Sequence, residues 1–253
     1  MQARAKGKYR VRLAKCEADL LATQRLRYLA FRDEQSSTEN LENLDQDRFD
    51  LICDHVLVED RHSGQLLCSF RMMSFSSGAD IPSSYSAQFY DLTTLKYFRG
   101  PMVEIGRFCI HPQAQDPDLL RAAWAVITDF VDRNGVELLF GCSSFKGTDT
   151  LPYSDAFAVL RDKHVAPKRW LPKVKAPKVF DYVARAKAKG DPKKAMRLMP
   201  PLLRTYLLMG GWVSDHVVVD GQMNTLHLFT GVEIKTIPPA RKRLLRTLSA
   251  ALA

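Results

Sequence analysis

The segment Val-Glu-Ile-Gly-Arg-Phe-Cys-Ile, residues 103–110, has the apolar alternation of a β-strand but carries two opposite charges. An isolated ion in a half-buried strand is costly, so Glu104 and Arg107 must be paired or solvated. We therefore predict that the two side chains line a polar cleft. The alternative, from the residues alone, is an ion pair at a strand edge that faces water.

The residues on either side predict a mixed architecture. Residues 119–133 are amphipathic, Asn134-Gly135 suits a helix end, and residues 136–142 are apolar, which predicts a strand–helix–strand unit. Residues 76–100 have no clear period and are predicted to be irregular. Further periodic segments predict strands at 9–15, 53–59, 66–73, 212–219 and 225–231 and helices at 19–33, 153–163 and 200–209.

This order of elements indicates an α/β or α+β fold with a mixed sheet. The length of 253 residues suits a single large domain over residues 1–253. We expect it to carry a basic, Pro- and Lys-rich insertion at about 164–199 and a basic helix at about 238–253.

Composition excludes several classes of protein. No uninterrupted apolar run approaches the roughly 18 residues of a membrane span, and no apolar segment of a signal peptide follows the basic N-terminus. The five cysteines are odd in number, lack Cys-x-x-Cys spacing and lie in apolar segments. We predict that they are reduced core residues of a cytoplasmic protein, with no disulfide and no metal site.

Charge is unevenly distributed along the chain. Residues 17–60 contain 12 acidic and 4 basic residues, whereas residues 161–197 contain 13 basic and 3 acidic residues. The acidic region would suit a cationic substrate, and the basic region would suit an anionic partner.

Two short motifs could indicate other chemistry. Cys142 follows a strand in the run Gly-Cys-Ser-Ser-Phe, but no recognisable His/Asp constellation accompanies it, so we predict a structural role. His55 and Asp60 have the His-x4-Asp spacing of glycerolipid acyltransferases. On a strand, however, residues five apart face opposite sides of the sheet, and we interpret the spacing as coincidence.

One ordered set of charged and aromatic residues is more specific. Its three acids and three arginines could form an ion-pair network around a polar cleft. In chain order the set comprises Arg27 and Phe31 on one helix face, Asp47 and Asp50, the strand residue Arg71, and Glu104, Arg107 and Phe108. This set resembles the acyl-homoserine-lactone synthases, which have a GNAT-like fold and take acyl groups from acyl carrier protein.

Downstream motifs resemble a second family, the ornithine N-acyltransferases of bacterial ornithine-lipid synthesis. They are Gly-Cys-Ser-Ser-Phe-x-Gly-Thr-Asp at 141–149, Tyr-x2-Ala-Phe at 153–157 and Pro-Pro-Leu-Leu-Arg-x-Tyr-Leu-x-Met-Gly-Gly at 200–211. With the upstream motifs this resemblance covers most of the chain, and we take the second family as the closer one.

The resemblance implies a GNAT-like acyl-CoA N-acyltransferase fold with a mixed, mostly antiparallel central sheet flanked by helices. It implies transfer of a 3-hydroxyacyl group from acyl carrier protein to the α-amine of L-ornithine, giving lyso-ornithine lipid. No cofactor is expected, because the donor is a phosphopantetheine thioester on acyl carrier protein. The alternatives are N-acylation of another amine, including the lactone-forming reaction, or a non-enzymatic basic protein that binds nucleic acid or membrane.

The resemblance also implies roles for individual residues. Glu104 is expected to be the base that takes a proton from the α-amine, or else a scaffold paired with Arg107 or Arg71. Acids are expected to bind the ornithine side-chain ammonium, and arginines its carboxylate. The expected substrate-binding residues are Asp47, Asp50, Arg71, Arg107, Arg27 and Phe31; alternatively, Asp47, Asp50 and Arg71 form a structural network beneath the site.

The donor is expected to meet two surfaces. In GNAT-like folds the pantetheine arm lies between two neighbouring strands, here at Phe108, Cys109, Ile110, Cys142 and Ser143. Acyl carrier protein is acidic and could land on the basic segment, at Lys163, Lys168, Arg169, Lys173, Lys175 and Lys178. The competing explanations for this segment are an anionic membrane, which would place the enzyme peripherally at the inner membrane, a solvated loop, and nucleic acid, which no recognised motif supports.

Overall fold

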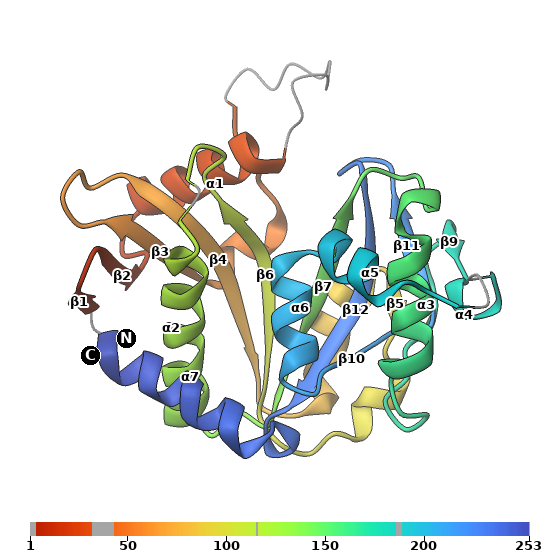
Figure 1. Ribbon diagram of the computed structural model, residues 1–253. Coiled ribbons are helices and arrows are strands. Elements are labelled where there is room, and N and C mark those ends of the chain that lie inside the picture. The colour runs from red at the N-terminus through yellow and green to blue at the C-terminus, as the bar shows by residue number, and fades with distance from the viewer. Residues whose placement is uncertain (1–3, 32–42, 115, 186–188, 253) are drawn as a thin grey trace. The chain divides into compact units, whose positions relative to one another are not determined.

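The computed structural model describes residues 4–31, 43–114, 116–185 and 189–252 (Figure 1). The chain divides into two compact units. The first comprises Met1–Ser74, Ile105–Val136 and Lys242–Ala253, and the second comprises Phe75–Glu104 and Glu137–Arg241. Strand β6 (Met102–Ile110), the charged strand of the sequence, begins in the second unit, and from Ile105 onward it belongs to the first.

The first unit contains a run of strands in the order β1–β2–β3–β4–β6. Successive strands from β1 to β4 pair antiparallel. Val56 lies opposite Phe70 and Val58 opposite Cys68, and all four side chains are buried, so burial of this face specifies the register. The bounds are β1 Arg4–Lys6, β2 Tyr9–Leu13, β3 Asp54–Asp60 and β4 Leu66–Phe75, the last residue of which belongs to the second unit.

Helices pack against these strands. α1 (Glu17–Phe31) contacts β3, and α2 (Asp118–Asn134) contacts β2 and β3. α2 confirms the predicted helix at 119–133, and Gly135 ends it with φ 59°, a left-handed conformation that favours glycine. α7 (Pro239–Leu252) is tied to α2 by an ion pair of 2.9 Å from Arg246 Nε to Asp132 Oδ2.

The second unit contains the other strands. β6 pairs parallel with β7 (Leu138–Lys146) only from Met102 opposite Leu138 to Glu104 opposite Phe140. β7 pairs antiparallel with β12 along its whole length. The remaining strands are β12 Thr225–Glu233, β11 Val217–Asp220, β10 Trp212–Val213 and β9 Val179–Phe180, with β5 Tyr90–Asp91 and β8 Lys173–Val174 forming a separate pair.

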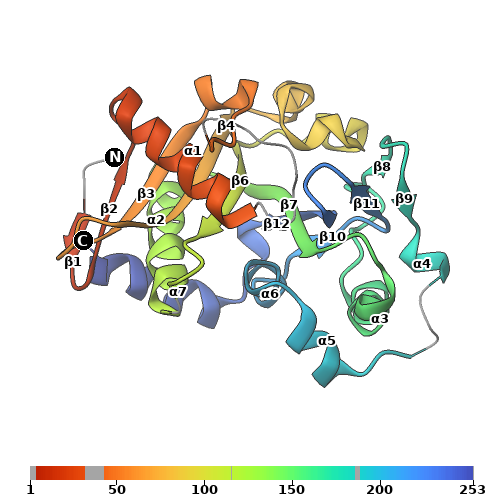
Figure 2. The same cartoon turned by 90° about the horizontal axis from the view of Figure 1, so that it is seen from above.

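Short helices cover this part of the sheet. Phe145, Leu226 and Leu228 of the strands share a buried core with Phe157 of α3 and Leu203 of α6. Figure 2 shows α5 beside α3, in agreement with their contacts. The helices are α3 Ser154–Lys163, α4 Tyr182–Arg185, α5 Pro192–Leu198 and α6 Pro201–Leu208.

Six 3₁₀ turns complete the described elements. Four of them lie in loops of the second unit and one follows β12, whereas η1 belongs to the first unit. Their bounds are η1 Arg48–Leu51, η2 Gly78–Ser83, η3 Ser86–Gln88, η4 Thr93–Tyr97, η5 Leu151–Tyr153 and η6 Ile234–Thr236.

The predicted fold class is confirmed: the sheet is mixed and mostly antiparallel, and helices flank it. The segment 76–100, predicted to be irregular, contains η2, η3, β5 and η4. The strand predicted at 212–219 is two strands, β10 and β11. The described helices include none long and apolar enough to cross a membrane.

The cysteines are free thiols, as predicted. Cys68 and Cys109 are buried, and Cys53 and Cys142 are partly buried. The prediction of a core position is wrong for Cys16, which is exposed because it lies just before α1, outside any strand.

Candidate functional site

Six charged side chains of the first unit form one network, which we call the arginine–aspartate cluster. Helix α1 supplies Arg27, strand β4 supplies Arg71 and strand β6 supplies Arg107. The three aspartates come from η1 and the residues just before it. The members are Arg27, Asp45, Asp47, Asp50, Arg71 and Arg107.

Asp50 is the most enclosed acid of the cluster. Arg27 donates to it twice, from Nη1 to Oδ1 at 2.7 Å and from Nη2 to Oδ2 at 2.8 Å. Arg71 Nη1 donates to Oδ1 at 2.8 Å and Gln24 Nε2 to Oδ2 at 3.0 Å. These donors occupy both oxygens of the carboxylate, which is what a buried ion requires.

Asp47 and Asp50 also build the local backbone. They form a capping box around η1: the Asp47 side chain accepts from the backbone N–H of Phe49, and the Asp50 side chain accepts from that of Asp47. The Asp47 side chain, 19% exposed against 4% for Asp50, faces more solvent. Arg71 Nη2 and Arg107 Nη2 both reach Asp47 Oδ2, at 3.0 and 3.1 Å.

Arg107 adopts a left-handed backbone conformation, φ 50°, inside β6. A non-glycine residue there is strained, and the surrounding contacts must hold it. Its Nε donates to Asp45 Oδ1 at 3.1 Å, and the same oxygen lies 3.0 Å from Arg27 Nε. Arg27 Nη2 also donates to the Asp45 carbonyl. Asp45 therefore joins β6 to α1.

The arginines set the pKa values of the acids. Burial raises the pKa of Asp50, but hydrogen bonds and charge from Arg27 outweigh it and hold the pKa well below its usual range. Burial also opposes ionisation of Asp47, and the pKa is nevertheless lowered by the hydrogen bond and charge of Arg71 and by the charge of Arg107. Asp47 and Asp50 are therefore carboxylates at neutral pH.

His55 lies beside the arginine–aspartate cluster and does not pair with Asp60. Its Nε2 lies 3.0 Å from the Asp50 carbonyl oxygen, and its Nδ1 lies 3.4 Å from Thr23 Oγ1. Asp60 instead accepts from the backbone of His62 and Ser63 in the following turn. The interpretation of the His-x4-Asp spacing as coincidence is confirmed.

Glu104 is the centre of a second polar group, which lies in the second unit. Its side chain is buried, and three donors from one loop converge on it. The backbone N–H of Tyr85 donates to Oε2 at 2.8 Å, and Ser86 donates to Oε1 from its backbone N at 2.8 Å and from its Oγ at 2.5 Å. All three are donors, the pattern that an ionised carboxylate accepts.

Two further side chains complete this Glu104 group. Cys142 Sγ of β7, partly exposed, lies 3.4 Å from Ser86 Oγ. Tyr206 of α6 is buried, and burial first, then the charge of Glu104, raise the pKa of its phenol. The group therefore combines Tyr85, Ser86, Glu104, Cys142 and Tyr206.

A family model described as "Acetyltransferase (GNAT) domain" matches residues 26–125. The chain is 32% identical over 226 residues to an L-ornithine N(alpha)-acyltransferase of Rhodobacter capsulatus, with 86% of each chain covered. The chain belongs to the L-ornithine N(alpha)-acyltransferase family.

The comparisons also match a second curated relative and a solved structure. An L-ornithine N(alpha)-acyltransferase of Brucella abortus is 29% identical, over 91% of this acyltransferase and 86% of the relative. The structure of FeeM, an N-acyl amino acid synthase from uncultured soil microbes, aligns over 100% of both chains with 10% identity and a TM-score of 0.46.

The other residues predicted for donor binding in this acyltransferase have diverse environments. In the first unit, the Phe108 ring stacks on Phe70 with centroids 5.4 Å apart, and Cys109 Sγ donates to the Ser69 carbonyl at 3.6 Å. Burial raises the pKa of Cys109 to about 12, so it is a thiol. Ile110 is partly buried, and so is Phe31 of α1, which was predicted to bind the substrate.

The side chains of Ser143 and Cys142 lie on opposite faces of β7. Ser143 lies opposite Leu228 of the buried core, and its Oγ accepts a hydrogen bond of 3.0 Å from Thr230. Cys142 lies opposite Phe229, on the other face of the strand. Ser143 thus has a structural contact, and Cys142 joins the Glu104 group.

All six basic residues predicted to receive acyl carrier protein are exposed. Two of them also have local partners: Arg169 Nη2 lies 3.2 Å from Glu233 Oε1, and Lys175 Nζ donates to the Ala87 carbonyl at 2.5 Å. Lys163 ends α3, Lys173 lies in β8, and Lys168 and Lys178 lie in the adjoining loops.

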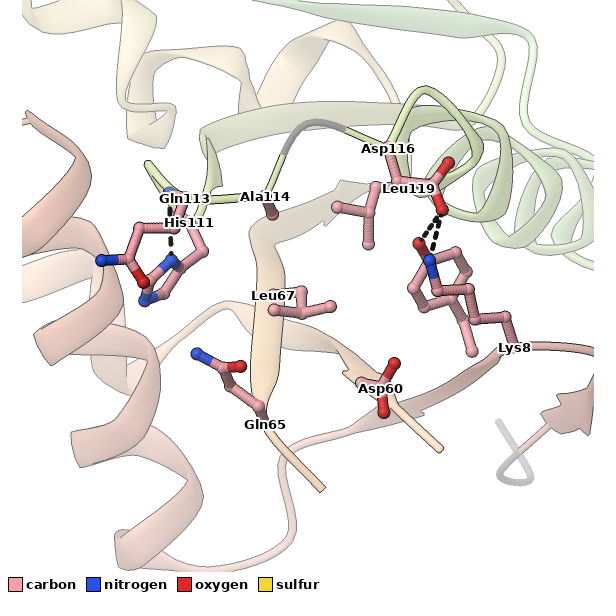
Figure 3. A pocket seen from close by; sticks show the side chains of 10 residues that line it. Lys8, Asp60, Gln65, Leu67, His111, Gln113, Ala114, Asp116 and Leu119 are labelled. Atoms are coloured by element: carbon pink, nitrogen blue, oxygen red, sulfur yellow. Dashed lines mark hydrogen bonds and ion pairs between the residues drawn. The ribbon is translucent and has the colours of Figure 1, made fainter. Parts of the chain in front are cut away.

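A pocket of 330 Å³ in the first unit contains none of the residues predicted for the site (Figure 3). Lys8 Nζ and the Tyr9 hydroxyl both reach Asp116 Oδ2, at 2.7 and 2.6 Å, across part of it. The rest of the lining is Asp60, Gln65, Leu67, His111, Gln113, Ala114 and Leu119.

Sequence reasoning missed Asp45 and the Ser86 loop. The alternation of Asp45 with Asp47 was a usable signal, since both acids precede the same 3₁₀ turn. Tyr85 and Ser86 gave no periodic signal, because Tyr85 reaches Glu104 through its backbone N–H and Ser86 lies in a three-residue turn.

Proposed function

We propose that this acyltransferase moves a 3-hydroxyacyl group from acyl carrier protein to the α-amine of L-ornithine and forms lyso-ornithine lipid. The observation that carries the proposal is the match to L-ornithine N(alpha)-acyltransferases over most of both chains. The arginine–aspartate cluster and the Glu104 group supply charges of the kind that this reaction needs.

Glu104 is the proposed base. Amide formation from a thioester requires a neutral amine, and the α-amine of an amino acid is mostly protonated at pH 7. The three donors on Glu104 hold its carboxylate in one orientation with both oxygens engaged. A carboxylate fixed in this way can accept the amine proton directly or through a water molecule.

The more exposed members of the arginine–aspartate cluster are the proposed ornithine ligands. Asp47 would take the side-chain ammonium, and Arg107 would take the carboxylate as a fork. Asp50 and Arg27, both nearly fully buried, would support them. Arg71 donates to both Asp47 and Asp50, and would fix the distance between the exposed ligand Asp47 and the buried Asp50.

The donor would lie along the second half of β7. The parallel register of this strand with β6 covers only Leu138–Phe140, whereas its register with β12 continues to Lys146. We assign this half of β7, which includes Cys142, to the pantetheine arm. The role of Phe108, Cys109 and Ile110 of β6, in the first unit, stays a prediction from the resemblance alone. No metal takes part in this scheme.

The exposed bases from Lys163 to Lys178 form the proposed landing surface for acyl carrier protein. Such a surface would accelerate encounter with an acidic protein, and salt would weaken it.

A separate surface is proposed for peripheral contact with the inner membrane. α5 exposes Met196 and Leu198, each 41% accessible, beside Lys193, Lys194 and Arg197. Arg204 of α6 donates to the Met196 carbonyl, and Leu208, one turn further along α6, is 56% exposed. Apolar side chains among bases suit an anionic bilayer surface. An enzyme there would deliver an amphiphilic product directly.

The test is purified protein supplied with acyl carrier protein that carries a 3-hydroxyacyl chain. We expect thiol release that depends on L-ornithine and an ornithine-containing lyso-lipid in the product. Lysine and Nα-acetylornithine are matched controls for side-chain length and for the α-amine. Thiol release with other amines but never with ornithine would contradict the proposed acceptor, and release only from acyl-CoA would contradict the proposed donor.

A further inference from the structure

We propose that Glu104, Ser86 and Cys142 form a proton relay that carries the proton of the attacking amine to the departing pantetheine thiol. This inference rests on the proposed function, since it assigns to one chain of side chains both proton transfers of an acyl transfer.

The three side chains are hydrogen-bonded in series within the second unit. Ser86 Oγ donates to Glu104 Oε1 at 2.5 Å, and Cys142 Sγ lies 3.4 Å from Ser86 Oγ. A serine hydroxyl has one proton, and Ser86 directs it to Glu104. The contact with sulfur is therefore made by the thiol proton of Cys142, so the chain runs from thiol to hydroxyl to carboxylate.

Two of the three residues are buried and the third is accessible to a bound donor, as a proton relay requires. Ser86 and Glu104 are buried, and Cys142 is partly exposed on β7, the strand proposed for the pantetheine arm. A buried hydrogen-bonded chain excludes competing water, and a partly exposed thiol can meet a donor sulfur.

The proton steps balance. Before the attack the ammonium loses its extra proton to water through Glu104, which leaves the carboxylate ionised again. The neutral amine nitrogen then forms the bond to the thioester carbonyl carbon and passes a second proton to Glu104. As the carbon–sulfur bond breaks, the departing sulfur takes the electron pair and the thiol proton of Cys142. Ser86 passes its hydroxyl proton to the Cys142 thiolate and receives the proton held by Glu104. The enzyme returns to its starting state, with an amide and a protonated pantetheine thiol as products.

Substitutions at three positions can distinguish the proposed relay from a purely structural role of these side chains. Ser86→Ala removes the hydroxyl but keeps the backbone N–H bond to Glu104. Cys142→Ala removes the last member, and Cys142→Ser keeps a proton-carrying group there. Ser84→Ala is the matched control, because Ser84 is buried in the same loop and its Oγ accepts from the Ala87 N–H and not from the relay.

The experiment compares two acyl donors of the same chain, the acyl carrier protein thioester and an aryl thioester whose thiol is acidic enough to leave without a proton. With the natural donor we expect Ser86→Ala and Cys142→Ala to lower kcat by roughly 100-fold, the usual size of a general acid contribution, with KM little changed. With the aryl donor we expect both variants to approach the wild-type rate. Cys142→Ser should recover part of the natural rate, and Ser84→Ala should match the wild type.

Equal losses with both donors would overturn the relay and leave a structural role for Ser86. An unchanged kcat of Cys142→Ala with the natural donor would also overturn it, and this variant does not depend on the folding of the Ser86 loop. The ratios can be measured with whichever amine the wild-type enzyme acylates. Failure of ornithine as acceptor would thus count against the proposed function alone.

Discussion

Arg27 and Asp50 form a buried, bidentate ion pair between α1 and η1. The two bonds are 2.7 and 2.8 Å long, and the two side chains are 1% and 4% exposed. Two parallel bonds between a planar guanidinium and a carboxylate restrict both position and orientation. The pair therefore determines how the η1 segment, which carries Asp47, meets the helix.

Loss of the Asp50 charge should destabilise the protein. In Asp50→Asn, the amide leaves Arg27 and Arg71 buried with a weaker partner, and breaking such a pair costs about 3–5 kcal/mol. Urea unfolding followed by circular dichroism measures the change in the free energy of unfolding. Asp132→Asn is a suitable control, because its ion pair with Arg246 is exposed and contributes little to stability. Similar losses in the two variants would contradict the structural role of Asp50.

Asp47 should affect ornithine binding more than stability. Its side chain is more exposed than that of Asp50, and a ligand ammonium would pair with it. We expect Asp47→Asn to raise the KM for ornithine by roughly 10-fold or more, since a charged hydrogen bond is worth about 1.5–3 kcal/mol. The KM for the acyl donor should stay the same. A parallel increase in both KM values would indicate general distortion instead.

Glu104→Gln should slow acyl transfer without preventing folding. The variant keeps the shape of the side chain but cannot accept the amine proton, so we expect kcat to fall by roughly 100-fold or more near pH 7. The loss should shrink as pH rises and more of the amine is already neutral. Initial rates between pH 6 and 9 measure the effect. A wild-type rate across this range would remove Glu104 as the base and leave its scaffold role.

His227 should make the protein less stable as the medium is acidified. Burial lowers its pKa from 6.5 to about 4. Between these values the unfolded chain binds a proton that the folded chain does not, so the free energy of unfolding falls as pH falls from about 6.5 towards 4.

His227→Phe should remove part of this decline, on the order of 2–3 kcal/mol. The Tyr90 hydroxyl keeps its bond of 2.8 Å to the backbone carbonyl of residue 227, so the variant leaves that group satisfied. Denaturant unfolding at pH 7, 6, 5 and 4 measures how the free energy of unfolding changes with pH in the wild type and in the variant. His55, whose pKa burial also lowers, is present in both proteins and cancels in the comparison. The same dependence on pH in both proteins would contradict the role assigned to His227.

Substitutions in two sets of basic residues should distinguish the proposed surface for acyl carrier protein from the proposed surface for the membrane. Replacing Lys163, Lys168, Lys173 and Lys178 by Ser should raise the KM for acyl carrier protein at low salt, and the difference from wild type should shrink as salt is added. An unchanged KM at low salt would remove the landing surface.

Replacing Lys193, Lys194 and Arg197 by Gln should instead weaken binding to vesicles that contain phosphatidylglycerol, on the order of 100-fold at about 1 kcal/mol per charge. Neutral phosphatidylcholine vesicles are the control lipid, and each variant set is the control for the other. If the α5 variant lost acyl carrier protein affinity but kept vesicle binding, α5 would be a protein-docking surface.

Local sequence was sufficient wherever a short-range pattern controlled the structure. The apolar periodicity of residues 119–133 and the glycine after them determined α2 and its end, because helix burial and helix termination depend on near neighbours in the chain. Alternation likewise determined β6, and the acidic and basic segments were visible as composition. The motifs around Arg27, Asp47, Arg71 and Arg107 were sufficient to indicate that these residues act together.

Tertiary structure alone decided which atoms meet. Asp45 joins Arg27 to Arg107, and Ser86 reaches Glu104 from a loop that has no periodicity. The separation of the buried Asp50 from the more exposed Asp47 also follows from packing and not from their spacing. Hydrogen bonds between residues far apart in sequence depend on the path of the backbone between them, and no local pattern of side chains records that path.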